Sequence, residues 1–64
     1  MMKNEIKKFR LEREITQDKL AEVVGVSRQT IIAIEKGNYI PSLMLAMQLA
    51  HFFKVSVDQL FTMR

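Results

Sequence analysis

Arg28 and Gln29 carry the side chains in this sequence that are best suited to recognising the edges of nucleobases. An arginine can donate two hydrogen bonds to O6 and N7 of guanine, and a glutamine matches adenine in a similar way. Both residues stand at the start of a predicted helix, in which Ile31 and Ile34 repeat at the spacing of a core face. Each helical residue turns by about 100°, so Arg28 and Gln29 fall on the opposite face. This face could contact bases in the major groove of DNA.

The same helix face continues with Ile32, Ala33 and Lys36. Ile32 and Ala33 leave two interpretations open: they contact thymine methyl groups, or they lie beyond the bases. Lys36 is suited to a phosphate. Thr30 is expected to be a phosphate ligand or to fill the region of the helix cap.

Catalytic and metal-binding chemistry find little support among the residues. The sequence has no cysteine and a single histidine, His51, which stands among apolar residues, and its carboxylates are scattered along the chain. Nucleophilic, acid–base and metal catalysis each need a cluster of such groups. We therefore expect no enzyme, no catalytic residue, no metal and no cofactor. A chain of 64 residues is also too short to enclose a small-molecule ligand.

The net charge favours an anionic partner. The uneven distribution of charge indicates that such a partner would be bound by contacts to specific residues and not by general attraction to a cationic surface. Ten basic and seven acidic residues give a net charge of +3. Residues 14–35 nevertheless hold two basic and four acidic groups, so a uniformly cationic surface is not expected. The longest stretch without a charged residue, 37–53, is too short and too polar to span a bilayer comfortably. We expect a cytoplasmic, nucleoid-associated protein with no membrane partner.

Four hydroxyl residues mark the expected starts of helices. Each has an apolar residue before it and another four positions later, a pattern typical of a capped helix with a hydrophobic staple; they are Thr16, Ser27, Ser42 and Ser56. Gly25 and Gly37 suit left-handed helix ends. No run alternates with the period of a strand. The pattern predicts an all-α single domain over 1–64, with helices at 4–13, 17–24, 28–36, 43–53 and 57–62.

The helix at 43–53 is apolar on nearly every side, which is typical of a helix buried on every side. Helical spacing assigns Leu43, Ala46, Leu49, Ala50 and Phe53 to its core face, and leaves Met44, Leu45, Met47 and Phe52 on a second apolar face. A domain this small cannot cover that second face itself. We therefore expect a homodimer, with an interface formed by Met44, Met47, Phe52 and Met63.

The helices at 17–24 and 28–36 are joined by a tight turn, Gly25-Val26-Ser27, as in a helix-turn-helix unit. The spaced residues that define this unit are Gln17, Leu20, Ala21, Gly25, Val26, Ser27, Ile31, Ile34, Glu35 and Gly37. This run closely resembles the Xre family of lambda-repressor-like regulators, and above all its minimal single-domain members. Pro41-Ser42-Leu43 and the segment Val55–Phe61 extend the resemblance, which covers about residues 6–61.

The resemblance implies a five-helix fold that binds double-stranded DNA. Gln17 matches the family's glutamine, and we expect contacts to the DNA backbone at Gln17, Ser27, Thr30, Lys36, Asn38 and Tyr39. The resemblance also implies a structural ion pair between Arg10 and Glu35. Glu14 and Lys54 depart from the pattern, because both occupy turns where the family commonly has glycine. The favoured function is a transcriptional repressor on a palindromic operator. A DNA-binding antitoxin, or a protein-interaction module of the same fold, is the alternative. The residues do not distinguish a repressor of transcription from an activator.

Overall fold

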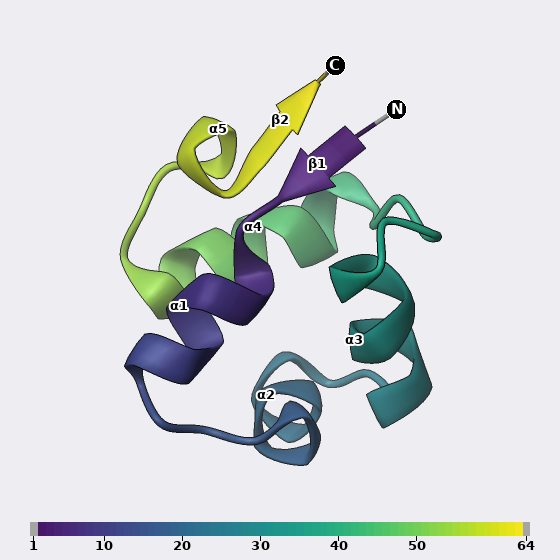
Figure 1. Cartoon of the computed structure of the whole chain (residues 1–64), viewed down its shortest axis with the longest axis vertical. Helices are drawn as coiled ribbons and strands as arrows, with labels where there is room; N and C mark the ends of the chain where they lie inside the picture. Colours follow the sequence, from purple (N-terminus) through teal and green to yellow (C-terminus); the bar gives the residue numbers. More distant parts are fainter. Residues whose placement is uncertain (1, 64) are drawn as a thin grey trace.

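Side-chain hydroxyls cap the N-termini of four helices in the computed structural model, which describes residues 2–63. Thr16, Ser27, Ser42 and Ser56 each accept a hydrogen bond from the backbone N–H three residues later, as predicted. Ser56 and Gln59 complete a capping box. The helices are α1 (Ile6–Glu12), α2 (Gln17–Val24), α3 (Arg28–Glu35), α4 (Leu43–Phe53) and α5 (Val57–Leu60), shown in Figure 1.

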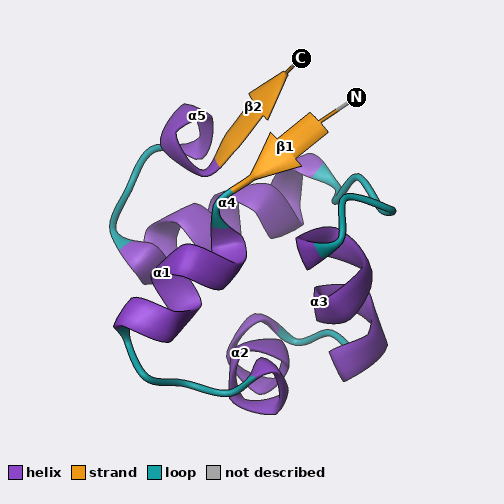
Figure 2. Cartoon of the chain, in the orientation of Figure 1, coloured by secondary structure: helices purple, strands orange, loops and turns teal. Residues whose placement is uncertain are grey.

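The five-helix fold is confirmed, and the two ends of the described chain add a short paired ribbon that the sequence did not predict. Strands β1 (Met2–Asn4) and β2 (Phe61–Met63) form an antiparallel ribbon in which Asn4 faces Phe61. Figure 2 shows this ribbon at the end of the molecule where both termini lie. The first helix therefore starts at Ile6 and not at residue 4, and the last ends at Leu60 and not at residue 62. Three-residue strands carry too short a pattern for the period of two to be visible in the sequence.

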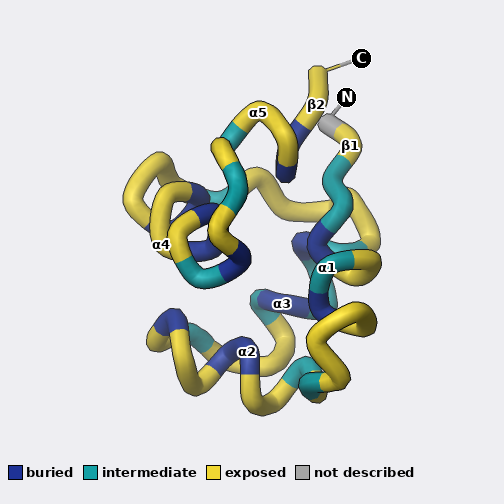
Figure 3. The backbone as a smooth tube through the Cα atoms, turned by 90° about the vertical axis from the view of Figure 1, so that its left-hand side faces the viewer, coloured by how far each residue is buried: buried dark blue, intermediate teal, exposed yellow. Residues whose placement is uncertain are grey.

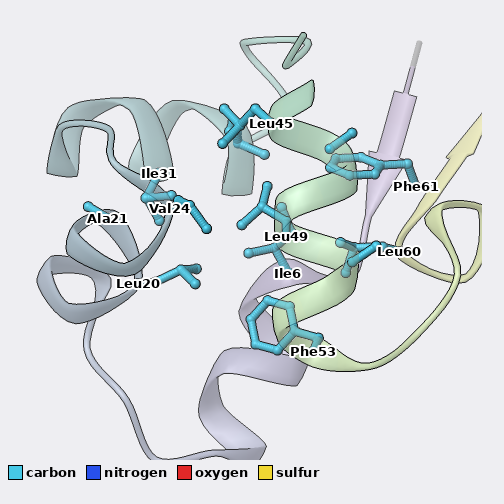
Figure 4. Packing of buried hydrophobic residues seen from close by; sticks show 13 residues of the cluster. Ile6, Leu20, Ala21, Val24, Ile31, Leu45, Leu49, Phe53, Leu60 and Phe61 are labelled. Carbon is cyan, nitrogen blue, oxygen red and sulfur yellow. The ribbon is translucent and has the colours of Figure 1, made fainter. Parts of the chain in front are cut away.

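The hydrophobic core is built around α4. Figure 4 shows side chains from α1, α2, α3 and α5 converging on this helix, and Figure 3 shows the buried segments facing the interior. The fully buried side chains are Ile6, Leu20, Ile31, Ile34, Leu49 and Leu60. The predicted core is confirmed for these six residues. No helix of the described residues is long and apolar enough to cross a membrane.

The predicted orientation of α4 is wrong at its first turn. Leu43, assigned to the core, is 73 % exposed, and Leu45, assigned to the second face, is only 6 % exposed. The spacing of this helix did not discriminate between them, because nearly every position is apolar. The core face of α4 therefore begins at Leu45 and continues through Ala46, Leu49, Ala50 and Phe53.

Two turns hold a residue other than glycine in the left-handed backbone region, where glycine was expected from the family pattern. Glu14 has φ 56° and Lys54 has φ 60°. At the end of α4, the N–H of Lys54 donates to the carbonyl of His51, and the N–H of Val55 donates to that of Ala50. A side chain with a Cβ costs about 1–2 kcal/mol in this conformation.

Replacing Lys54 with glycine is expected to stabilise the protein. Relief of the left-handed strain outweighs the extra entropy of the unfolded glycine, and the net gain is about 1 kcal/mol. In a thermal melt this raises Tm by about 4–8 °C for a domain of this size. Lys54→Ala is the control, because it removes the same charge but keeps the Cβ. An equal rise in Tm for both variants would assign the effect to charge and contradict the strain.

Candidate nucleic-acid interface

The turn between α2 and α3 brings these two helices into contact. Gly25 adopts φ 75° at the end of α2, and the N–H of Val26 donates to the Ala21 carbonyl at 3.0 Å. Ala21 is buried, and its short side chain lets α2 approach α3 closely. Figure 1 shows α2 and α3 as successive helices that cross at a large angle. This arrangement is a helix-turn-helix unit, as the spacing predicted.

Helix α3 has one buried face and one accessible face. Ile31 and Ile34 are fully buried, whereas Arg28, Gln29 and Lys36 are exposed. Ile32 and Ala33 lie between these extremes. The accessible face therefore carries the long hydrogen-bonding side chains of Arg28 and Gln29 at the N-terminal end of α3. In the middle of the helix it carries the half-buried apolar side chains of Ile32 and Ala33, as expected from the sequence.

Ser27 and Thr30 form the cap of α3. Ser27 Oγ accepts from the Thr30 N–H at 3.2 Å and lies 3.0 Å from Thr30 Oγ1. Both hydroxyls are thus engaged in the first turn, and Thr30 occupies the cap region that was one of its two predicted places. Ser27 is exposed and Thr30 half-buried, so a phosphate could still approach this end of the helix.

The ion pair implied by the family resemblance forms inside the domain. Arg10 Nε lies 2.7 Å from Glu35 Oε2 and Arg10 Nη2 lies 3.3 Å from Glu35 Oε1, while the side chains are 9 % and 5 % exposed. Arg10 Nη1 also donates to the Ile15 carbonyl at 3.0 Å. Gln17 Nε2 donates to Glu35 Oε1 at 3.1 Å. Glu35 therefore links the ends of three helices, α1, α2 and α3, through charge-assisted bonds.

A polar depression lies where α1 and the N-termini of α2 and α3 meet; it is lined by Lys7, Arg10, Thr16, Gln17, Asp18 and Arg28. Arg28 Nε is 3.8 Å from Asp18 Oδ1, in a pair that solvent largely surrounds. Lys7 is an exposed residue of this depression. Its place in this depression follows from the spacing of three residues to Arg10 on the same helix.

The loop after α3 is exposed but anchored at its start. The N–H of Gly37 donates to the Ile34 carbonyl, and that of Asn38 to the Ala33 carbonyl, both at 2.9 Å. Asn38 and Tyr39 are exposed and follow Lys36 directly. The structure thus places these three predicted phosphate ligands together at the C-terminal end of α3.

The helix-turn-helix family model HTH_3 matches residues 6–60. The chain belongs to this helix-turn-helix family. It is 55 % identical over 60 residues to an uncharacterized HTH-type transcriptional regulator of Methanocaldococcus jannaschii, covering 94 % of this chain and 91 % of that protein. It is 35 % identical to the phage CTXphi transcriptional repressor RstR of Vibrio cholerae, covering 94 % of this chain and 54 % of the repressor. The chain is 34 % identical in sequence to a protein of Bacteroides fragilis whose crystal structure is described as that of a putative DNA-binding protein. The two structures superpose with a TM-score of 0.84, over 97 % of this chain and all of that one.

Membership of the HTH_3 family confirms the resemblance stated from the motif. The family consists of DNA-binding transcriptional regulators and not of enzymes, so the predicted class of function is also confirmed. In the part of the chain that the structure describes, no cluster of three histidine or carboxylate groups could hold a metal ion.

The outer side of α4 in this HTH_3 domain is apolar and accessible. Leu43, Met44 and Met47 are 73 %, 72 % and 56 % exposed, and Gln48 and His51 continue the same surface. We call these five residues the α4 outer face. Phe52 does not belong to it. Its ring packs on the core, 5.1 Å from that of Phe53, and the Arg13 guanidinium lies 5.3 Å from it.

Met63 is 83 % exposed on β2, so it too presents apolar surface to solvent. Of the four residues predicted for a dimer interface, the structure thus leaves Met44, Met47 and Met63 accessible. It places Phe52 at the margin of the core.

Proposed function

We propose that the protein is a transcriptional repressor that binds a palindromic operator as a homodimer, with α3 in the major groove. The observation that carries the proposal is the exposure of Arg28 and Gln29 at the N-terminus of α3, while Ile31 and Ile34 fix the opposite side in the core. The first residues of a recognition helix contact base edges in helix-turn-helix complexes. Repression is supported by the relative in Vibrio cholerae, which is named a transcriptional repressor.

The proposed base contacts divide along α3. Arg28 reads guanine and Gln29 reads adenine, because their side chains match the acceptors and donors of these bases. Ile32 and Ala33 lie one turn further along and provide apolar contact to thymine methyl groups. Backbone contacts come from residues on both sides of α3: Gln17, Ser27, Thr30, Lys36, Asn38 and Tyr39.

Gln17 is proposed to bind a phosphate while it is held by Glu35. A side-chain amide has two N–H donors, and the bond to Glu35 uses one of them. The other donor remains for a phosphate at the N-terminus of α2, where free backbone N–H groups and the helix dipole favour an anion. Lys7, in the same depression, adds positive charge.

This proposal is tested by measuring the binding constants for a specific and a non-specific duplex at increasing salt concentrations. The logarithm of the binding constant is expected to fall linearly with the logarithm of salt concentration, by about 0.9 for each phosphate neutralised. A duplex selected for tight binding should remain about 10³-fold or more tighter than a random duplex. Equal affinity for both duplexes would contradict base readout.

The homodimer is proposed on the basis of the α4 outer face. Leu43, Met44 and Met47 are exposed side by side on it, and a second copy of the chain would cover them. Large contiguous apolar patches, above a few hundred Å², are rare on monomers and mark interaction surfaces. A single recognition helix contacts few base pairs, whereas two helices related by a two-fold axis, about 34 Å apart, read both halves of a palindrome.

A charge in the α4 outer face is expected to split the dimer. Met44→Glu puts a carboxylate where the partner would cover it, and burying that charge without a counter-ion is strongly unfavourable. Sedimentation at micromolar concentration should show a dimer for the wild type and a 7.5 kDa species for the variant. Leu11→Glu is the control, because Leu11 is an exposed apolar residue on α1. A wild type that sediments as a monomer contradicts the dimer.

A further inference from the structure

Asn4, in the terminal ribbon, bonds α1 and α3 through the two ends of its side-chain amide. Asn4 Oδ1 accepts from the N–H of Ile6 at 3.2 Å, at the start of α1. Asn4 Nδ2 donates to the carbonyl oxygen of Ile34 at 2.7 Å, near the end of α3. One side chain thus binds the first N–H of α1 and holds the last turn of α3.

The Ile34 carbonyl lies where α3 gives way to the loop that follows. Carbonyl groups in the last turn of a helix have no partner within it. The Gly37 N–H donates to this oxygen at 2.9 Å, and the Asn4 amide supplies a second hydrogen bond to it. These two bonds fix the point from which Lys36, Asn38 and Tyr39 leave the helix.

The ribbon that carries Asn4 is itself anchored to the core. Asn4 pairs with Phe61 across the ribbon, and Phe61 is 8 % exposed. The N–H of Glu5 donates to the Leu60 carbonyl at 2.9 Å. Asn4 is therefore held by α5 and β2 and can act as a fixed support for α3.

We propose that Asn4 is a positioning residue for DNA recognition, which sets the position of the C-terminal end of α3 and its loop relative to the core. This inference rests on the proposed role of α3 in the major groove. Glu35, the last residue of α3, is bonded to α1 and α2 through Arg10 and Gln17, and Asn4 adds a contact from the terminal ribbon to the same end of the helix. Recognition depends on such supporting contacts, because hydrogen bonds to bases tolerate little displacement.

Two substitutions separate the bond to α3 from the bond to the Ile6 N–H at the start of α1. Asn4→Ser and Asn4→Asp both keep an oxygen that can accept from the Ile6 N–H. Both remove the amide N–H₂ that donates to the Ile34 carbonyl. Asn4→Ser removes it without adding a charge. Each variant should lower the ratio of specific to non-specific DNA affinity by about fivefold, the effect of one lost hydrogen bond.

Hydrogen exchange gives a second measurement that needs no DNA. The amides of Gly37 and Asn38 should exchange faster in both variants, because the end of α3 loses its support. The amide of Val26, which donates to Ala21 in the turn before α3, should keep its rate.

Ser56→Ala is the control for a general loss of stability, because it removes the cap of α5 and leaves α3 untouched. It should lower Tm without changing the affinity ratio. An unchanged ratio in both Asn4 variants, or unchanged exchange at Gly37 and Asn38, overturns the proposal. If the wild type itself prefers no duplex, the proposed function fails at the same time, and the exchange rates show separately whether Asn4 supports α3.

Discussion

Glu35→Ala is expected to destabilise the protein by about 3–5 kcal/mol. Arg10 is buried, and the substitution leaves its guanidinium with the Ile15 carbonyl as its only remaining hydrogen-bond partner among the described residues. It also releases the Gln17 amide, which donates to the same carboxylate. Because a domain of this kind has a total stability of about 5–15 kcal/mol, the loss would be a large part of the whole. Thermal and urea denaturation measure it.

Glu22→Ala is the matched control for this prediction. Glu22 also pairs with a basic residue, Lys19, at 3.6 Å, but both side chains are largely exposed. Such a surface pair contributes about 0–1 kcal/mol. Similar losses for Glu35→Ala and Glu22→Ala would show that burial of the Arg10–Glu35 pair does not matter. The double variant Arg10→Ala/Glu35→Ala should cost less than the sum of the single variants, since no unpaired charge remains.

Arg28→Ala is expected to weaken binding to the preferred duplex by about 1–3 kcal/mol and to relax the preference at one base pair. The arginine lies at the first position of α3 and is exposed, so its removal should leave Tm nearly unchanged. Competition binding against duplexes that differ at single positions identifies the base pair concerned.

Lys36→Ala provides the comparison for a contact to phosphate. It should weaken binding to all sequences by a similar factor and reduce the slope of the salt dependence by about 1. If Arg28→Ala gives the same pattern as Lys36→Ala, then Arg28 contacts only the DNA backbone. Base readout would then have to come from Gln29 and the residues that follow.

The helix-turn-helix unit could be predicted from the sequence because its signals are local. A hydroxyl cap needs only the apolar residues around it, and Gly25 marks its turn by a backbone conformation that few other residues accept. The buried face of α3 follows from the spacing of Ile31 and Ile34 alone. The buried Arg10–Glu35 pair, in contrast, came from the family resemblance, since no local rule joins residues on different helices.

The features that were missed depend on contacts between distant parts of the chain. The ribbon joins Asn4 to Phe61, and each strand is too short to show a pattern by itself. Asn4 was assigned to the first helix, so its bond to Ile34 had no basis in the sequence. In α4, residues 43 and 45 are both leucine, so only the packing of the folded domain distinguishes the buried Leu45 from the exposed Leu43.

Selection from a random duplex library tests most directly the claim that α3 reads bases in duplex DNA. The wild-type protein is expected to enrich one palindromic sequence, with half-sites about 34 Å apart from centre to centre. The half-site should contain a guanine and an adenine that suit Arg28 and Gln29. A library that shows no enriched sequence after repeated rounds, while the protein remains folded, would contradict the claim.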